Sequence, residues 1–136
     1  MPASLGLSHV AMSVPEGTLT DDFRERLLDF YGRMLGWREI DALRLPDRLT
    51  ISVGRSSYVN VRERPDSAIY HGYDHVGVLV SSPEELRRLW QDLADQPDDV
   101  DLEPLTPNDQ GEGSFRFRHL LPLAVEPGFY ASLVRG

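Results

Sequence analysis

One eight-residue pattern occurs twice in the chain, and it constrains the fold more than any other feature. The copies read L-S-H-V-A-M-S-V at residues 7–14 and Y-D-H-V-G-V-L-V at residues 73–80. Each copy places a histidine at the front of an alternating strand, and a helix-like segment follows. The sequence therefore predicts two copies of one βα unit.

The length and the repeat together indicate one domain, residues 1–136, made of two half-size modules. In a chain of 136 residues, each module alone would bury too little surface to be stable, so we expect the two to share a core. No apolar run reaches the length of a membrane span, and the first residues lack the basic and apolar regions of a signal peptide. We expect a cytoplasmic protein with no membrane partner.

Charge and cysteine content narrow the partners and the chemistry. The net charge is −8, and no cluster of Lys and Arg stands free of acidic residues, which argues against binding to nucleic acid. The chain has no cysteine, so disulfides, thiolate metal sites and a cysteine nucleophile are excluded. A metal ion would have to be held by His, carboxylate, hydroxyl or amide groups.

Both modules have the same predicted element order, βαβββ. In module one, about residues 5–64, Thr20 caps a helix and Gly36 ends it. In module two, about residues 73–136, S-P-E-E at 82–85 has the form of a capping box with proline at the first helical position. Residues 65–72 link the modules. The predicted elements are strands at 7–14, 38–43, 49–53, 58–64, 73–80, 100–105 and from 115 on, helices at 21–35 and after Ser82, and a polar loop at 107–114.

The two histidines lie at equivalent positions of the repeat. Their neighbours on the same strand face are small or modest, Ala11 and Ser13 in one copy and Gly77 and Leu79 in the other, so we expect a cavity beside each histidine. If the modules are related by a pseudo-twofold axis, His9 and His75 can converge on one divalent metal ion. The alternative is that each is a hydrogen-bonded core or surface histidine.

The repeat and one further segment resemble a known group of proteins. The βαβββ pair, the strand-leading histidines in L-S-H-V and Y-D-H-V, and the run F-Y-G-R-M-L-G-W at 30–37 resemble the vicinal oxygen chelate superfamily, which includes glyoxalase I, extradiol dioxygenases and bleomycin-binding proteins. The resemblance implies a glyoxalase-like α+β fold, with two βαβββ modules whose mixed β-sheets form a cup. It also implies a homodimer that takes a small organic molecule. It is specific for the fold and leaves the activity open.

In metal-using members of this superfamily, the ligands come from the first and last strand of each module. The first strands supply His9 and His75. The last strand of module one places Asn60 at the ligand position, where a neutral amide oxygen is a poor ligand for a transition metal. Tyr58 and Arg62 share the Asn60 face, so all three are candidate substrate contacts.

The last strand of module two can be read in two registers. In one, Glu126 takes the ligand position, and both His9 to Asn60 and His75 to Glu126 are then 51 residues apart. His9, His75 and Glu126 would form a two-histidine, one-carboxylate site for Fe, Mn, Ni or Zn. In the other register, residues 129–134 form the final strand, Ser132 takes the position as a substrate contact, and the pocket is metal-free with no cofactor.

These registers support different functions. The first predicts a metal-dependent enzyme, a glyoxalase- or dioxygenase-like lyase, isomerase or oxygenase, with Glu126 also in a catalytic role. The second predicts a metal-free binding or sequestration protein of the bleomycin-resistance type. A third hypothesis is a metal-independent enzyme in which His119 or a carboxylate acts as general base.

Overall fold

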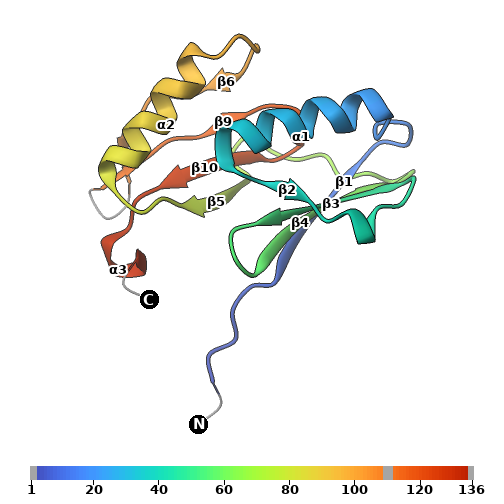
Figure 1. Ribbon diagram of the computed structural model, residues 1–136, viewed down its shortest axis with the longest axis horizontal. Helices are drawn as coiled ribbons and strands as arrows, with labels where there is room; N and C mark the ends of the chain where they lie inside the picture. The colour runs from blue at the N-terminus through green and yellow to red at the C-terminus, as the bar shows by residue number, and fades with distance from the viewer. Residues whose placement is uncertain (1–2, 109–111, 135–136) are drawn as a thin grey trace. The chain divides into compact units, whose positions relative to one another are not determined.

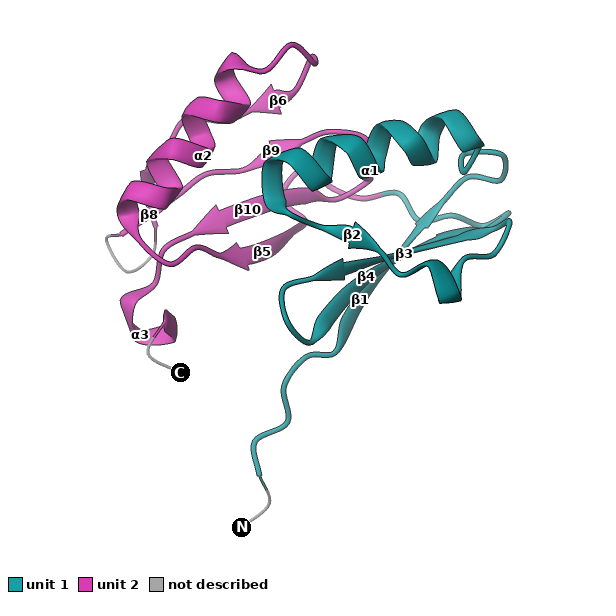
Figure 2. Ribbon diagram, viewed as in Figure 1, with its two compact units in different colours: residues 1–69 teal, residues 70–136 magenta. Residues whose placement is uncertain are grey.

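The computed structural model describes residues 3–108 and 112–134 of the chain. It has the predicted α+β architecture (Figure 1). Two compact units divide the chain, residues 1–69 and residues 70–136 (Figure 2). The single domain and the module boundaries given above stay predictions.

Unit 1 is a four-stranded mixed sheet with one long helix. The strand order is β1-β4-β3-β2, with β1 parallel to β4 and the other neighbours antiparallel. This confirms the βαβββ order. The predicted strand at 38–43 is only partly right, because the N–H groups of Leu43 and Arg44 donate to carbonyls three residues back and form a 3-10 turn. The elements are β1 (His9–Val14), α1 (Asp21–Leu35), β2 (Arg38–Glu39), η1 (Asp41–Leu43), β3 (Arg48–Val53) and β4 (Ser57–Glu63).

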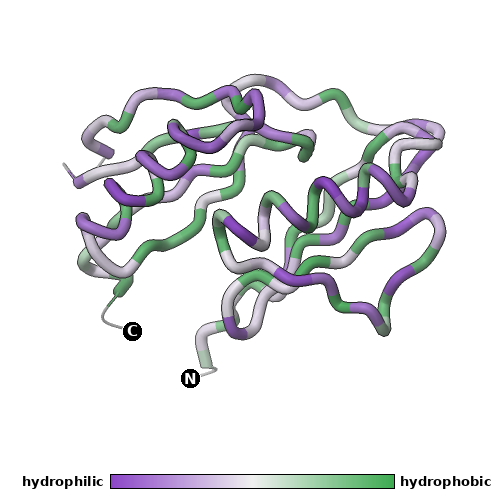
Figure 3. The backbone as a smooth tube through the Cα atoms, turned by 45° about the horizontal axis from the view of Figure 1, so that its top comes forward, coloured by the Kyte–Doolittle hydropathy of each residue, from purple (hydrophilic) through white to green (hydrophobic). Residues whose placement is uncertain are grey.

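Helix α1 begins and ends where its capping residues predict. The Thr20 side chain accepts a hydrogen bond from the Phe23 N–H, and Gly36 adopts φ 71°, the left-handed conformation that glycine takes without strain. Hydrophobic and hydrophilic residues alternate along the helix (Figure 3). Its buried side chains join those of the sheet in the core of the unit, which includes Met12, Val14, Leu27, Phe30, Tyr31, Trp37, Leu49, Ile51, Val59 and Val61.

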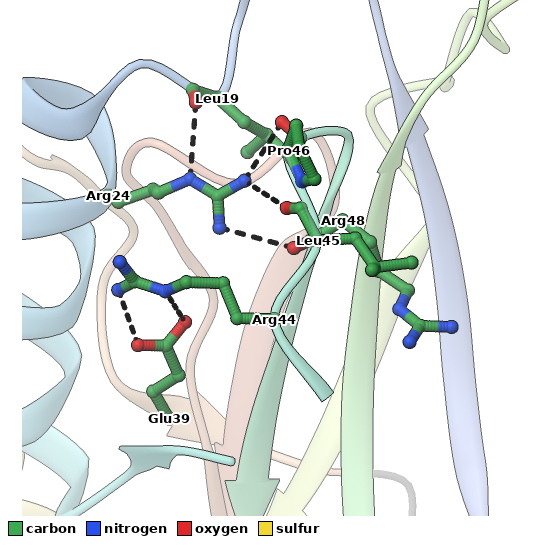
Figure 4. Close-up of polar contacts among 7 residues, drawn as sticks. All are labelled: Leu19, Arg24, Glu39, Arg44, Leu45, Pro46 and Arg48. Carbon is green, nitrogen blue, oxygen red and sulfur yellow. Dashed lines mark hydrogen bonds and ion pairs between the residues drawn. The ribbon is translucent and has the colours of Figure 1, made fainter. Parts of the chain in front are cut away.

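A buried arginine on α1 binds the backbone of the segment that leads into β3. Arg24 is only 4% exposed. Its guanidinium donates to the carbonyl oxygens of Leu19 at 3.1 Å, Arg48 at 3.1 Å, Leu45 at 2.6 Å and Pro46 at 3.0 Å (Figure 4). Four backbone acceptors therefore satisfy the buried guanidinium, which fixes the approach to β3 against the helix.

Unit 2 repeats this plan with shorter strands. Strand β5 pairs in parallel with β10, and β10 pairs on its other side with both β8 and β9. Strand β3 of unit 1 thus corresponds to the two short strands β8 and β9, and the edge strand β2 corresponds to β6 and β7. The elements are β5 (His75–Leu79), α2 (Pro83–Asp95), β6 (Asp101–Leu102), β7 (Thr106–Pro107), β8 (Gly113–Ser114), β9 (Phe117–Arg118), β10 (Ala124–Gly128) and α3 (Ala131–Val134).

These short strands correct two predictions. The predicted strand at 100–105 is reduced to β6, and the predicted loop at 107–114 begins and ends in the paired strands β7 and β8. Residues 109–111 of that loop lie outside the described residues.

The last strand of unit 2 follows the first of the two registers. Strand β10 contains Glu126, which lies opposite Gly77 of β5. The alternative final strand at 129–134 is wrong, since Ser132 lies in helix α3. The helix follows because the Ala131 N–H donates to the Glu112 carboxylate at 2.9 Å, and the Leu133 and Val134 N–H groups donate to the Tyr130 carbonyl.

None of the described helices is long and apolar enough to span a membrane.

Candidate functional site

A polar cavity lies in unit 2 at the front of β5 and beside β10. Its volume is about 230 Å³, and its polar lining includes Tyr73, His75, Glu103, Asn108, Arg116 and Glu126. Charged groups of both signs and an imidazole therefore meet in one small space. This is the arrangement from which a metal or substrate site is built.

One hydrogen bond defines the state of His75. Its Nδ1 lies 2.6 Å from the backbone carbonyl oxygen of Tyr73. Because a carbonyl oxygen can only accept, Nδ1 carries the hydrogen, and neutral His75 has its free lone pair on Nε2. Metal-binding histidines are oriented in this way by a partner on their other ring nitrogen.

Glu126 faces that lone pair. Its Oε2 lies 3.6 Å from His75 Nε2, and the two side chains are only 21% and 23% exposed. Two acceptor atoms at this distance repel each other unless a cation lies between them. The cation can be a proton on Nε2 or a metal ion bound by both atoms.

The strand pairing leaves space next to this pair. Gly77 lies opposite Glu126 on β5, and a Cβ atom built on Gly77 would meet no heavy atom within 4 Å. The predicted open face beside His75 is present in unit 2.

The equivalent positions of unit 1 carry neutral groups. By strand register, Tyr58 lies opposite His9 and Asn60 lies opposite Ala11. The His9 ring stacks on Tyr58 with centroids 4.6 Å apart, and its Nδ1 lies 2.8 Å from the Ser8 hydroxyl. The two units therefore share one framework but not one set of side chains.

Asn60 and Arg62 lie on the β4 face that the sequence predicts. The Asn60 amide oxygen accepts from the Thr50 hydroxyl at 3.5 Å. Arg62 is exposed and lies 3.9 Å from Asp47. Their roles as substrate contacts stay predictions.

His119 lies apart from the cavity of His75 and Glu126. Its Nε2 is 3.8 Å from Asp98 Oδ2, and it lines a separate open cavity between residues 99–102 and 118–121. Ser132, in α3, is exposed and does not line the His75 cavity. The structure therefore does not bring these two candidates to Glu126.

Comparison with known proteins identifies the fold. No family model matches the chain, and no curated protein sequence matches it. A member of the glyoxalase/bleomycin resistance protein/dioxygenase superfamily from Sphaerobacter thermophilus is similar in structure, with a TM-score of 0.66 and 16% identity over 93% of this chain and 98% of that one. The chain has the fold of the vicinal oxygen chelate superfamily. This confirms the fold implied by the sequence resemblance.

Two other solved structures with a similar fold belong to proteins of different kinds. Lactoylglutathione lyase from Agrobacterium tumefaciens has a TM-score of 0.66 and 19% identity, covering 97% of each chain. A variant of the fosfomycin resistance protein FosX from Listeria monocytogenes, complexed with Mn(II) and 1S,2S-dihydroxypropylphosphonic acid, has a TM-score of 0.61 and 17% identity over 99% of this chain and 98% of that one. At such identities the likeness establishes the fold alone.

The donor atoms of unit 2 fit part of a metal site. Two ligand atoms about 2.1 Å from one ion lie about 3.0 to 3.4 Å apart in octahedral or tetrahedral geometry, close to the 3.6 Å between His75 Nε2 and Glu126 Oε2. Within residues 3–108 and 112–134, no group of three or more His, Asp or Glu side chains is arranged to hold a metal ion. The predicted ligand His9 belongs to unit 1, and its role stays a prediction.

The sequence analysis missed two residues of this cavity. Arg116 alternates with buried phenylalanines, which is typical of any half-exposed strand, and Glu103 lies in a short acidic segment. Only the antiparallel strand register places them in the site, because it sets Arg116 opposite Glu126 and Glu103 opposite Arg116. That register depends on strands that are only two residues long.

Proposed function

We propose that the chain is a small-molecule enzyme with a divalent metal centre that includes His75 and Glu126. One observation carries this proposal. Nδ1 of His75 is hydrogen-bonded to the Tyr73 carbonyl, so the lone pair of Nε2 faces the Glu126 carboxylate 3.6 Å away. When bound, the metal would serve as a Lewis acid for a substrate with two neighbouring oxygen atoms.

The residues of the chain have defined roles in this proposal. The Tyr73 carbonyl orients the imidazole, His75 and Glu126 supply two ligand atoms, and the open face at Gly77 leaves room for substrate. His9 is the predicted further ligand. Whether the reaction is an isomerisation, a lyase reaction or an oxygenation is left to substrate screening, and the homodimer stays a prediction.

A metal-free binding protein is the second candidate. It is favoured by the distance of 3.6 Å between Arg116 Nε and Glu126 Oε2, because an arginine already supplies a cation to that carboxylate. In this case a proton on His75 Nε2 would complete an imidazolium–carboxylate pair, and the cavity would hold an organic molecule by hydrogen bonds.

Metal titration separates the two candidates. The full chain, freed of metal by chelator, is titrated calorimetrically with Mn(II), Fe(II), Ni(II) or Zn(II). We expect one ion per chain, with affinity lowered at least about tenfold in His75→Ala and Glu126→Gln, and lowered in His9→Ala if the predicted further ligand is correct. His71→Ala and Glu84→Gln are matched controls, since both residues are exposed. Absence of binding by the unaltered chain would reject the metal centre.

A further inference from the structure

Three charged side chains form a row across the sheet of unit 2. Strand β10 pairs with the β8–β9 strand so that Gly128 lies opposite Ser114 and Val125 opposite Phe117, which places Arg116 opposite Glu126. The pairing of Leu102 with Phe117 places Glu103 opposite Arg116 on its other side. We call Glu103, Arg116 and Glu126 the charged row.

Arg116 is the shared member of the charged row. Its Nε lies 3.0 Å from Glu103 Oε2 and 3.6 Å from Glu126 Oε2. The face of the Tyr73 ring lies below the guanidinium, with 5.7 Å between the ring centroid and Cζ, a position that stabilises a cation. The Arg116 guanidinium can therefore pair with either Glu103 or Glu126, and of these two carboxylates only Glu126 also faces His75.

Glu103 is a fixed acceptor. Its N–H donates to the Arg116 carbonyl at 2.9 Å, and its own carbonyl accepts from the Trp90 indole N–H at 3.0 Å. The backbone of Glu103 is thus held both to the neighbouring strand and to α2. Its carboxylate, 3.0 Å from Arg116 Nε, therefore extends from a backbone position that is fixed beside Arg116.

We propose that Arg116 is a positioning residue that competes with the metal ion for Glu126, and that Glu103 receives Arg116 when the ion binds. This inference rests on the proposed metal centre. A divalent ion at Glu126 and the Arg116 guanidinium are like charges in a partly buried site, so they repel. Glu103 lowers the cost of metal binding because it offers Arg116 a second partner.

The equivalent row of unit 1 has no such device. Its members at the corresponding register positions are Asn60, Thr50 and Ile40, which are neutral. The competition therefore belongs to unit 2, whose first strand carries the oriented His75 and whose last strand carries the facing carboxylate of Glu126.

The test is the Mn(II) affinity of four forms of the full chain, measured by calorimetry. Arg116→Gln is expected to bind Mn(II) about tenfold more tightly than the unaltered chain, because the competing charge is gone. Glu103→Gln is expected to bind several-fold more weakly. In the double variant the Glu103→Gln change has little effect, because Glu103 acts through Arg116.

Two further variants separate charge from folding. Arg116→Lys keeps the positive charge and is expected to bind Mn(II) within about threefold of the unaltered chain. Arg118→Gln removes the same charge two residues away, on the side of the His119 cavity, and is expected to change the affinity less than about twofold. A merely structural role of Arg116 would weaken binding in both Arg116 variants and would not tighten it in either.

The outcomes are distinguishable. If the unaltered chain does not bind Mn(II), both the metal centre and this inference are overturned. If it binds Mn(II) but Arg116→Gln binds equally or more weakly, the inference alone fails. If Glu103→Gln weakens binding equally with and without Arg116, Glu103 acts as a general negative charge, and its role as the second partner is overturned.

Discussion

Arg24 illustrates how much of unit 1 depends on one buried side chain. Its guanidinium donates to four carbonyl oxygens from two separate stretches of chain, residue 19 and residues 45–48. A single planar group with five N–H donors suits this task, whereas an ammonium has only three donors on one atom. The role of Arg24 is therefore structural, and its identity as arginine matters as much as its charge.

Replacement of Arg24 is expected to destabilise the chain. Arg24→Met leaves the carbonyl acceptors without their donors and should lower the free energy of unfolding by about 3 kcal/mol, with Arg24→Lys in between. Urea denaturation measures both. Arg33→Met is the control on the same helix, because Arg33 is largely exposed and its ion pair with Asp29 is worth less than about 1 kcal/mol. Equal losses for Arg24→Met and Arg33→Met would contradict the structural role.

Two glycines of the paired strands β5 and β10 are expected to respond oppositely to alanine. A Cβ at Gly128 would lie 2.8 Å from Tyr130 Cε2 and 3.3 Å from Ser114 Cβ, so Gly128→Ala should cost about 2 kcal/mol. Gly77→Ala meets open space and should leave stability unchanged or raise it by up to about 1 kcal/mol. Thermal unfolding of the two variants tests this. A loss in Gly77→Ala as large as that in Gly128→Ala would show that the face beside His75 is already filled.

At the scale of elements, Glu85 links the first turn of α2 to Ser81, in the short connection that follows β5. The pKa of the Glu85 carboxyl is lowered, since the Ser81 hydroxyl and the Ser81 N–H both donate hydrogen bonds to it. A carboxyl whose pKa is lower in the folded state stabilises the fold above its unfolded value of 4.5. That contribution is lost as the pH falls through the folded value.

The stability of α2 should therefore weaken in acid through Glu85. We expect Glu85→Gln to lower the melting temperature at pH 6, and the gap to the unaltered chain to shrink as the pH falls below 4.5. Melting curves between about pH 6 and pH 3 measure the gap, and Glu84→Gln is the neighbouring exposed control. A gap that does not change with pH would mean that the charge of Glu85 is not what stabilises the helix.

The elements also show where sequence patterns succeed. Helix α1 matches the predicted residues 21–35 because its signals, Thr20 before it and Gly36 after it, are local. Local signals do not determine the residues of the final strand, β10. Pro127-Gly128 is a turn signal in isolation, but in the structure Pro127 lies opposite Val78, and its carbonyl accepts from the Phe115 N–H. Pairing with partner strands overrides the local preference.

At the scale of the whole chain, the two units repeat one framework and differ in the side chains that it carries. The sequence predicts His75 as a site residue and leaves Glu126 as one of two alternatives for the last strand, since strand spacing alone does not distinguish the two registers. It did not identify Arg116 or Glu103, because a cross-strand row exists only once three strands are in register. The equivalent row in unit 1 has the neutral residue Asn60 beside Thr50, so the charged row is a feature of unit 2.

The most direct test of the metal centre is the electron spin echo modulation of Mn(II) bound to the full chain. We predict modulation from a directly bound imidazole nitrogen that weakens in His75→Ala and is unchanged in His71→Ala. Identical modulation in the unaltered chain and in His75→Ala, or no imidazole signal at all, would contradict the account.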